Sequence, residues 1–252
     1  MSEVLLLDLV RQLEERFAEG RYASGFALGR HILQYYPRHL LTYRLMGLAA
    51  LDAGLVDDSV DLLQRALSVD PEDGQMWAAL HDAATRLDLH PDAEVAGAYA
   101  HDLLQPELGV SPIARGHAAA RAGDWDWAYD EYHKGFQIYP MRMDAGVGMM
   151  TALFELEQWE SSLSVALQIL TEMPFCLKSL WIAALSVIEL GQRGDLLEKW
   201  LRKARSIDPD DIYITRWHGG VFDELSLPVS ATLPAWDASE SWDYTHSASS
   251  SS

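Results

Sequence analysis

A regular spacing of prolines constrains this chain more than any other feature of its sequence. Six prolines recur at intervals of 34, 35, 34, 34 and 35 residues. They are Pro37, Pro71, Pro106, Pro140, Pro174 and Pro209. A near-constant period of this length is typical of repeat proteins in which each unit is one helical hairpin. One hairpin cannot bury its apolar face alone, so we expect neighbouring hairpins to stack and share a continuous core.

Two further columns of residues keep the same period. About twelve residues before the proline, five units carry a small residue and the sixth carries Leu197. These small residues are Gly25, Ser59, Ala93, Ala128 and Ser162. About five residues before the proline, the column reads Ile32, Ala66, Ala100, Gly135, Ile169 and Ala204. Small side chains let two helices approach closely, so we expect these columns to mark seams between helices.

Turn and cap residues fall between the expected helices. Gly20, Gly54 and Gly123 separate the two helices in three units, and glycine suits a helix C-cap because it accepts positive φ. Each repeating proline follows a second helix, which it cannot continue. An Asp directly before it, as at Asp70-Pro71, is predicted to cap the next helix, and so is Ser111 before Pro112.

Together these features resemble the tetratricopeptide repeat, or TPR, a 34-residue helical hairpin. The second unit carries the resemblance at Tyr43, Met46-Gly47, Gly54, Leu63, Ala66 and Pro71. The fourth carries it at Gly116, Gly123, Trp125, Ala128, Tyr132 and Pro140. The resemblance covers roughly residues 4–210. It implies an all-α fold, a right-handed superhelical solenoid of about six TPR-like helix-turn-helix repeats.

We expect the repeat array to occupy residues 1–210 and two further segments to follow it. The units are predicted at roughly 4–39, 40–73, 74–108, 109–142, 143–176 and 177–210. Residues 211–225 are expected to form a partial capping helix. Residues 226–252 contain no lysine or arginine, and we expect a flexible, acidic, aromatic and Ser-rich tail without its own core. The third unit departs from the pattern at His81 and His90-Pro91, which predicts irregular packing there.

Charge and cysteine content narrow the possible partners and the expected location. The chain has 38 acidic and 19 basic residues, a formal charge of −19. Nucleic acids and anionic membranes both need clustered positive charge, so we expect neither as a partner. The single cysteine, Cys176, allows no intramolecular disulfide and is predicted to be a buried structural thiol. There is no signal-peptide pattern and no apolar stretch long enough to span a membrane, so a cytoplasmic location is expected.

The motifs that would indicate catalysis are missing. The sequence has no glycine-rich phosphate loop, no His-Glu-x-x-His, no calcium-binding loop and no paired cysteines. The acidic run from Asp70 to Gly74 has the wrong spacing for an EF-hand and is interpreted as a helix cap. We therefore predict no catalytic residue, no metal site and no cofactor.

In a TPR array the first helices line the concave wall, and helical periodicity then predicts which residues face the groove. The predicted partner-binding residues are Arg44, Leu48, Asp82, Arg86, Ile113, His117, Arg121 and Thr151. The arginines and the histidine would form a basic cluster able to hold a carboxylate. The alternative is that the arginines pair with Asp52, Asp82 and Glu155 on neighbouring helices. The Lys and Asn residues with which some TPR proteins clamp chaperone tails are absent from the corresponding columns.

The tail offers a second candidate, because aromatic and acidic residues alternate in it. The predicted docking segment carries Trp236, Asp237, Trp242, Asp243 and Tyr244. Aromatic rings supply anchors and carboxylates supply steering, so the segment is suited to docking. We expect it in the groove near Arg86 and Arg121, of its own chain or of a neighbour. The alternatives are a tail that folds back on the last repeat, or one that only solvates the protein.

The resemblance implies a non-enzymatic adaptor or scaffold that binds a protein or peptide segment in its concave groove. Two other functions stay open. One is an assembly or secretion chaperone for a dedicated client, and the other is a regulatory module that senses a peptide or a small ligand. Self-association is also left open by the sequence.

Overall fold

The computed structural model describes residues 3–192, 194–218 and 230–236, and within them the chain forms thirteen helices and two short strands. The helices follow one another as six hairpins. Their first helices are α1 (Leu6–Ala18), α3 (Leu40–Asp52), α5 (Gly74–Arg86), α7 (Pro112–Ala122), α9 (Met143–Glu155) and α11 (Leu177–Glu189). Their second helices are α2 (Tyr22–Tyr35), α4 (Val56–Leu67), α6 (His90–Leu104), α8 (Trp125–Ile138), α10 (Trp159–Glu172) and α12 (Asp195–Arg205).

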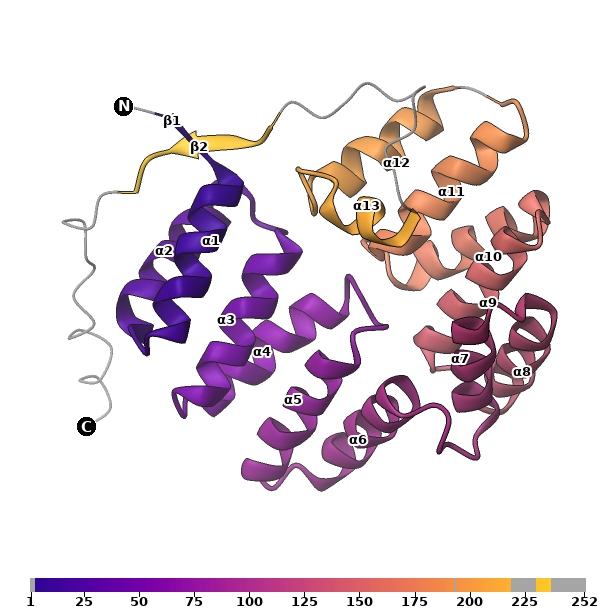
Figure 1. Cartoon of the computed structure of the whole chain (residues 1–252), viewed down its shortest axis with the longest axis horizontal. Helices are drawn as coiled ribbons and strands as arrows, with labels where there is room; N and C mark the ends of the chain where they lie inside the picture. The colour runs from indigo at the N-terminus through magenta and orange to yellow at the C-terminus, as the bar shows by residue number, and fades with distance from the viewer. Residues whose placement is uncertain (1–2, 193, 219–229, 237–252) are drawn as a thin grey trace.

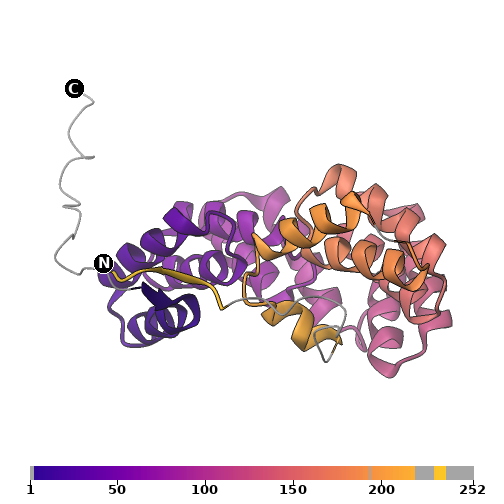
Figure 2. The same cartoon turned by 90° about the horizontal axis from the view of Figure 1, so that it is seen from above.

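The hairpins curve into a ring, as Figures 1 and 2 show from two directions. The ring closes where the last hairpin meets the second one. The backbone N–H of Leu177 donates to the carbonyl of Val69 at 2.9 Å, and Leu40 N–H donates to the carbonyl of Ile207 at 3.2 Å. The ammonium of Lys178 lies 2.7 Å from Glu72, which is 106 residues away in the sequence. The sequence predicted a superhelix, but not that it would close on itself.

The predicted columns of small residues are buried seams. Ser59 and Ser162 are fully buried in α4 and α10, and each occupies the same place in its unit. Their hydroxyls donate to carbonyls of the paired first helices, Ser59 to Gly47 at 2.8 Å and Ser162 to Met150 at 3.0 Å. In these two hairpins the seam therefore packs tightly without leaving the seryl hydroxyl unsatisfied.

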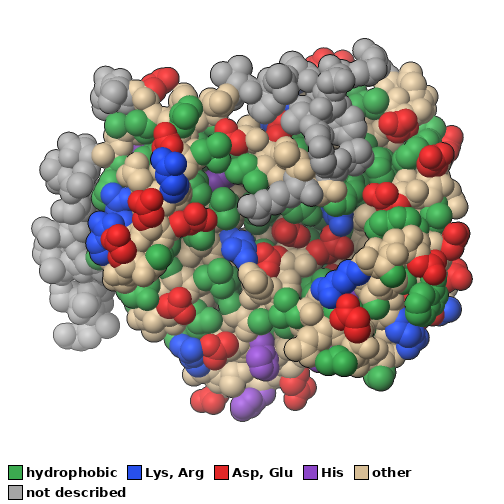
Figure 3. All heavy atoms as spheres, viewed as in Figure 1, with side chains coloured by type: hydrophobic (Ala, Val, Ile, Leu, Met, Phe, Trp, Pro, Cys, Tyr) green, Lys and Arg blue, Asp and Glu red, His purple; other side chains and the backbone are tan. Residues whose placement is uncertain are grey.

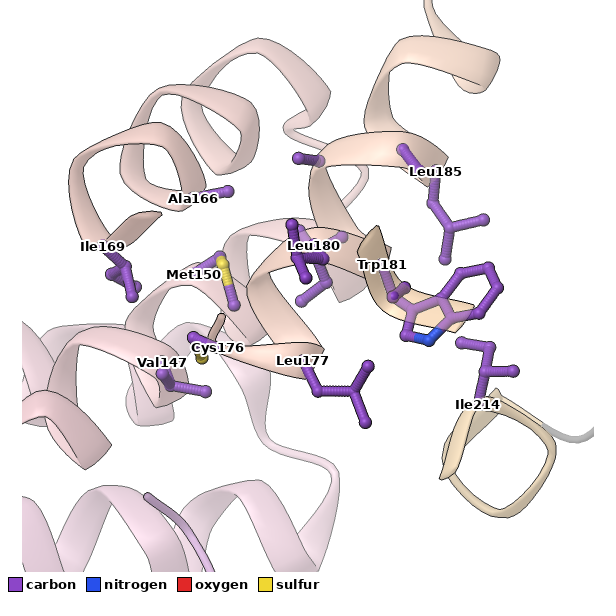
Figure 4. Packing of buried hydrophobic residues seen from close by; sticks show 14 of the residues in the cluster. Val147, Met150, Ala166, Ile169, Cys176, Leu177, Leu180, Trp181, Leu185 and Ile214 are labelled. Atoms are coloured by element: carbon purple, nitrogen blue, oxygen red, sulfur yellow. The ribbon is translucent and has the colours of Figure 1, made fainter. Parts of the chain in front are cut away.

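The largest apolar cluster joins the last two hairpins (Figure 4). Cys176 lies fully inside it, as predicted, and burial raises the pKa of its thiol to about 11, so the thiol stays protonated. Trp181 of α11 points toward Ile214 of the short helix α13 (Ile212–His218), as Figure 4 shows. Within the predicted capping segment, 211–225, the described helix is α13, and residues 219–225 of that prediction lie outside the described residues.

The two strands pair a segment near the N-terminus with one near the C-terminus. Strand β2 (Thr232–Pro234) pairs antiparallel with β1 (Glu3–Leu5), and Val4 lies opposite Leu233. Leu233 is buried in the apolar cluster of the first hairpin. This part of the predicted tail therefore differs from expectation, because it is packed in a core. The reason is that the first hairpin has no preceding repeat to cover its apolar face.

Helix caps follow the predictions in part. Ser111 caps α7 as predicted, because its hydroxyl accepts from Ala114 N–H at 3.0 Å. The cap of α5 is Asp73, which accepts from the N–H groups of Gln75 and Met76. Asp70 does not cap α5, because its carboxylate accepts from Glu72 N–H in the preceding turn.

A left-handed residue stands between the two helices of every hairpin. Four units use a glycine, Gly20, Gly54, Gly123 and Gly191, with φ between 67° and 77°. The third and fifth units place Asp88 and Glu157 there, with φ of 56° and 58°. A side chain in this conformation costs about 1–2 kcal/mol, so these two turns are strained where the other four are not.

We expect Glu157→Gly to stabilise the protein. Removing the side chain relieves the left-handed strain, and the greater freedom of glycine in the unfolded chain offsets part of the gain, which leaves about 0.5–1 kcal/mol. The matched substitution Gly123→Ala introduces the same strain and should destabilise by about 1 kcal/mol. Urea unfolding followed by circular dichroism measures both. Two unchanged midpoints would contradict the prediction.

Candidate functional site: the inner wall of the closed array

A cavity of about 340 Å³ lies on the inner wall of the ring. Side chains from α7, α8, α9, α11 and α13 line it, together with Glu72 from the loop after α4. The lining includes His117, Ala120, Arg121, Trp125, Thr151, Lys178 and Trp217. Figure 3 shows a hollow near the middle of one face of the molecule, with acidic and basic side chains on its walls.

Three predicted groove residues come together at this cavity: His117, Arg121 and Thr151. Arg44 instead lines a separate cavity of about 210 Å³ at the ring closure, and Leu48 packs against the cluster between α4 and α5. The expectation for Ile113 was wrong. It is fully buried in the core of the fourth hairpin, so no partner can reach it in this structure.

Each predicted groove arginine already has a carboxylate partner. Arg86 pairs with Asp82 at 2.6 Å, but within α5 and not between neighbouring helices, as the pairing alternative had it. Arg44 and Arg121 pair differently: Arg44 Nε lies 2.7 Å from Asp73, and Arg121 Nη1 lies 3.1 Å from Glu107. These arginines therefore do not form one shared basic cluster. The sequence missed Asp73 and Glu107 because both lie outside the groove-facing columns.

A buried chain of hydrogen bonds fixes His117 on the cavity wall. The Tyr132 hydroxyl lies 2.8 Å from His117 Nδ1, and His117 Nε2 lies 3.4 Å from Asp144. Burial raises the pKa of Tyr132 well above its usual value, so the hydroxyl keeps its proton and donates a hydrogen bond to Nδ1 of His117. His117 then carries its own proton on Nε2, directed at Asp144.

Arg142 anchors this chain of hydrogen bonds to the preceding hairpins. Its guanidinium meets Asp144 at 2.6 and 2.9 Å and Asp102 of α6 at 3.1 Å, and it stacks 3.9 Å over the ring of Tyr99. Burial alone would raise the pKa of Asp144, but hydrogen bonds from His117 and Arg142 outweigh it and lower that pKa. Arg142 therefore joins the third and fifth hairpins.

We expect Arg142→Ala to destabilise the protein by about 3–5 kcal/mol, because fully buried Asp144 would lose its main counter-charge. The matched control is Arg11→Ala, whose exposed ion pair with Asp8 should contribute under about 1 kcal/mol. Thermal and urea unfolding of both variants decide the matter. Equal effects of the two substitutions would show that the Arg142 network adds nothing to stability.

The ring closure buries carboxyl groups. Burial, with Glu72 and Asp73 nearby, raises the pKa of Asp70 to about 7. Burial likewise raises the pKa of Asp208 to about 6. Both line the 210 Å³ cavity with Arg44 and with Tyr213 of α13. At neutral pH the closure therefore contains carboxyls that resist ionisation.

The contribution of Asp70 to the free energy of unfolding should fall as pH rises from about 4 to about 7. Below pH about 4 Asp70 is protonated whether the chain is folded or unfolded. Above that, the unfolded carboxyl ionises more readily, so folding loses stability until the folded pKa of about 7 is passed. Asp70→Asn stays neutral, so its stability advantage should grow from pH 4 to pH 7 and then level off. Asp57→Asn, at an exposed position, is the control, and parallel pH profiles for Asp70→Asn and the wild type would refute the assignment.

Sequence reasoning missed several cavity residues, because their positions depend on closure. Glu72, Lys178 and Trp217 reach the cavity only where the last hairpin and α13 meet the second hairpin. Among the predicted tail residues, Trp236 lies over Arg16 of α1 and away from Arg86 and Arg121. Asp237, Trp242, Asp243 and Tyr244 lie outside the described residues.

No group of three or more His, Cys, Asp or Glu side chains in the described part of the chain is arranged to hold a metal ion. No described helix is both long enough and apolar enough to cross a membrane.

No protein-family model matches the sequence, and no curated protein matches it. Solved structures with a similar fold include YrrB, titled "a TPR protein with an unusual peptide-binding site". It is 11% identical, with a TM-score of 0.38 over 76% of this chain and 97% of its own. A tetratricopeptide repeat protein from Parabacteroides merdae is 15% identical, with a TM-score of 0.36 over 78% of this chain and 76% of its own. PilF of Pseudomonas aeruginosa is 11% identical, with a TM-score of 0.37 over 84% of this chain and 96% of its own.

The period of the chain and its own helices define its class. Six hairpins at an interval of 34 or 35 residues, each with a left-handed turn and a buried seam of small residues, form an all-α solenoid of TPR type. The protein is therefore a helical repeat scaffold whose inner wall carries a mixed aromatic, polar and charged cavity.

Proposed function

We propose that this scaffold binds a protein segment at the cavity on its inner wall. The cavity of about 340 Å³ carries the proposal, because it brings His117, Arg121 and Thr151 together with the ring of Trp217. Its size is at the lower end of ligand pockets, which suits one or two inserted side chains of a longer segment. Aromatic walls favour an apolar or aromatic anchor, and the polar groups set its orientation.

The position of Arg121 favours a partner segment that carries a carboxylate, with which the guanidinium can pair. Its side chain is 50% exposed, and its partner Glu107 is 62% exposed. Such exposed pairs contribute under about 1 kcal/mol, so a carboxylate of the partner can replace Glu107 at little cost. By contrast, the Lys178–Glu72 pair is largely buried at the closure and is less available for exchange.

Binding, and not catalysis, is the function proposed for this wall. Burial raises the pKa of Tyr132, so this phenol on the cavity lining stays protonated and is a poor nucleophile. The thiol of Cys176, whose pKa burial also raises, is not part of the lining. A preformed wall of helices that presents anchors and a charged group is suited to capture of a peptide segment.

Selection from a random peptide library on the immobilised protein tests the proposal. We expect enriched peptides that combine an aromatic residue with a carboxylate. Ala120→Trp fills the cavity from α7 and should weaken their binding at least tenfold, since the anchor loses its space. Ala118→Trp is the matched control, a partly buried alanine on the same helix that does not line the cavity.

Binding of the same peptides to charge-reversal variants is a second test. Arg121→Glu should weaken binding of the carboxylate-containing peptides, and Arg11→Glu, on the exposed face of α1, should not. Peptides that bind both tryptophan variants and both charge variants equally would place recognition elsewhere on the molecule and overturn the proposal.

A further inference from the structure

A seven-residue segment near the C-terminus, residues 230–236, is bound to the first hairpin as an extended strand. Besides the β1–β2 pairing, Leu6 N–H donates to the carbonyl of Ala231 at 2.8 Å. The Tyr36 hydroxyl donates to the carbonyl of Thr232 at 2.9 Å. His31 Nε2 lies 2.8 Å from the carbonyl of Pro234 and acts as the donor, because a carbonyl only accepts. The side chain of His31 in α2 and that of Tyr36, directly after α2, thus bind the backbone of the segment.

Side chains of the segment alternate between buried and exposed. Ala231 is 9% exposed and Leu233 is 2% exposed, and both join the apolar cluster of the first hairpin. Thr232 between them is exposed, as is Ala235. Trp236 is half-buried, and the guanidinium of Arg16 lies 4.9 Å from the centre of its ring. Main-chain bonds with pockets for alternate side chains are the physical basis of peptide recognition by strand addition.

The segment is recognised almost entirely by one hairpin. The cluster that receives Leu233 and Ala231 is formed by Leu6, Leu9, Val10, Leu13, Leu28 and Ile32. The hydrogen bond from Ala231 N–H to Asp210, at 3.1 Å, reaches the last turn of the array instead. The other hydrogen bonds of the segment lie within residues 3–36, and Leu41 and Leu45 of α3 pack against the same apolar cluster. These contacts recognise a short linear pattern. Such a pattern can be bound without being covalently attached to the site.

We propose that the face formed by β1, α1 and α2 is a binding site for extended protein segments of the pattern Ala-x-Leu-Pro-x-Trp, and that a segment of another protein occupies it in place of residues 230–236.

A separate partner fits this site better than a second copy of the chain. A second copy would bring the same seven residues and gain no new contact, while the attached segment has an effective concentration on the order of millimolar. A different protein can add contacts at the positions that Thr232 and Ala235 leave exposed, and so displace the attached segment. The chain's own segment then acts as a competitor that only stronger ligands overcome.

Binding of a synthetic peptide tests the site in the full-length protein. The probe is a fluorescent peptide of residues 230–236, Ser-Ala-Thr-Leu-Pro-Ala-Trp, and anisotropy is the measurement. Leu233→Asp in the protein should vacate the site and allow binding with one peptide per chain. The wild type should bind the probe roughly a hundredfold more weakly, because its own segment competes. Trp236→Ala is a second vacating variant, at a half-buried position that tolerates substitution more easily.

Matched controls distinguish specific binding of the peptide from non-specific binding. Within the Leu233→Asp background, Tyr36→Phe removes the donor to the peptide carbonyl and should weaken binding about fivefold. Tyr35→Phe, at the exposed neighbouring residue, should leave it unchanged. A peptide with Asp for Leu and Ala for Trp should not bind.

Equal binding of the probe to wild type and to both vacated variants would overturn the proposal. So would a dimer in sedimentation velocity that Leu233→Asp abolishes, since it would show that the occupant is a second copy. Binding at the first hairpin is also independent of the inner cavity, so Ala120→Trp should not affect this probe.

Discussion

A stack of helical hairpins buries apolar surface between neighbours, so its first and last hairpins each keep one face without a repeat to cover it. In this chain the two ends are covered by different means. The last hairpin meets α13, whose Ile214 packs on Trp181, and the first receives the strand that carries Leu233. Both covering segments come from the C-terminal part of the chain, and the ring closes between the second and last hairpins through Val69, Glu72 and Lys178.

Closure also changes the pKa values of carboxyl groups where the second and last hairpins meet. An open TPR groove would leave its carboxylates in water, where they ionise freely. Here the loop after α4 is pressed against the last hairpin, and the pKa values of Asp70 and Asp208 rise toward neutrality. Lys178 offsets part of the negative charge by pairing with Glu72. In this chain, with a formal charge of −19, some carboxyls at the closure therefore ionise less readily and others are paired, which makes the stability of the closed ring depend on pH.

The repeat architecture could be predicted because its signals are local. The prolines, the small residues such as Ser59 and Ser162, and the glycine turns each act within one hairpin, and the structure places them as predicted. Only some of the predicted groove residues line the inner cavity, since periodicity along one helix cannot show what a distant segment covers. It placed His117 and Thr151 on the wall, but it also placed Ile113 there, which the packing of the fourth hairpin buries. Lys178 and Glu72, 106 residues apart, have no shared signal in the sequence.

The two candidate binding surfaces differ in how firmly their residues are held, and this difference bears on what each can recognise. At the inner cavity, His117 is fixed by Tyr132 and Asp144, and Asp144 in turn by Arg142, so one wall is rigid while exposed Arg121 can exchange partners. At the first hairpin, recognition uses the backbone of the bound strand, and side-chain identity matters chiefly at the positions of Leu233 and Trp236. A rigid pocket with one exchangeable charge selects a side chain, whereas a strand-adding edge selects a short sequence pattern. The two surfaces share no residue, so the binding proposed for one does not block the binding proposed for the other.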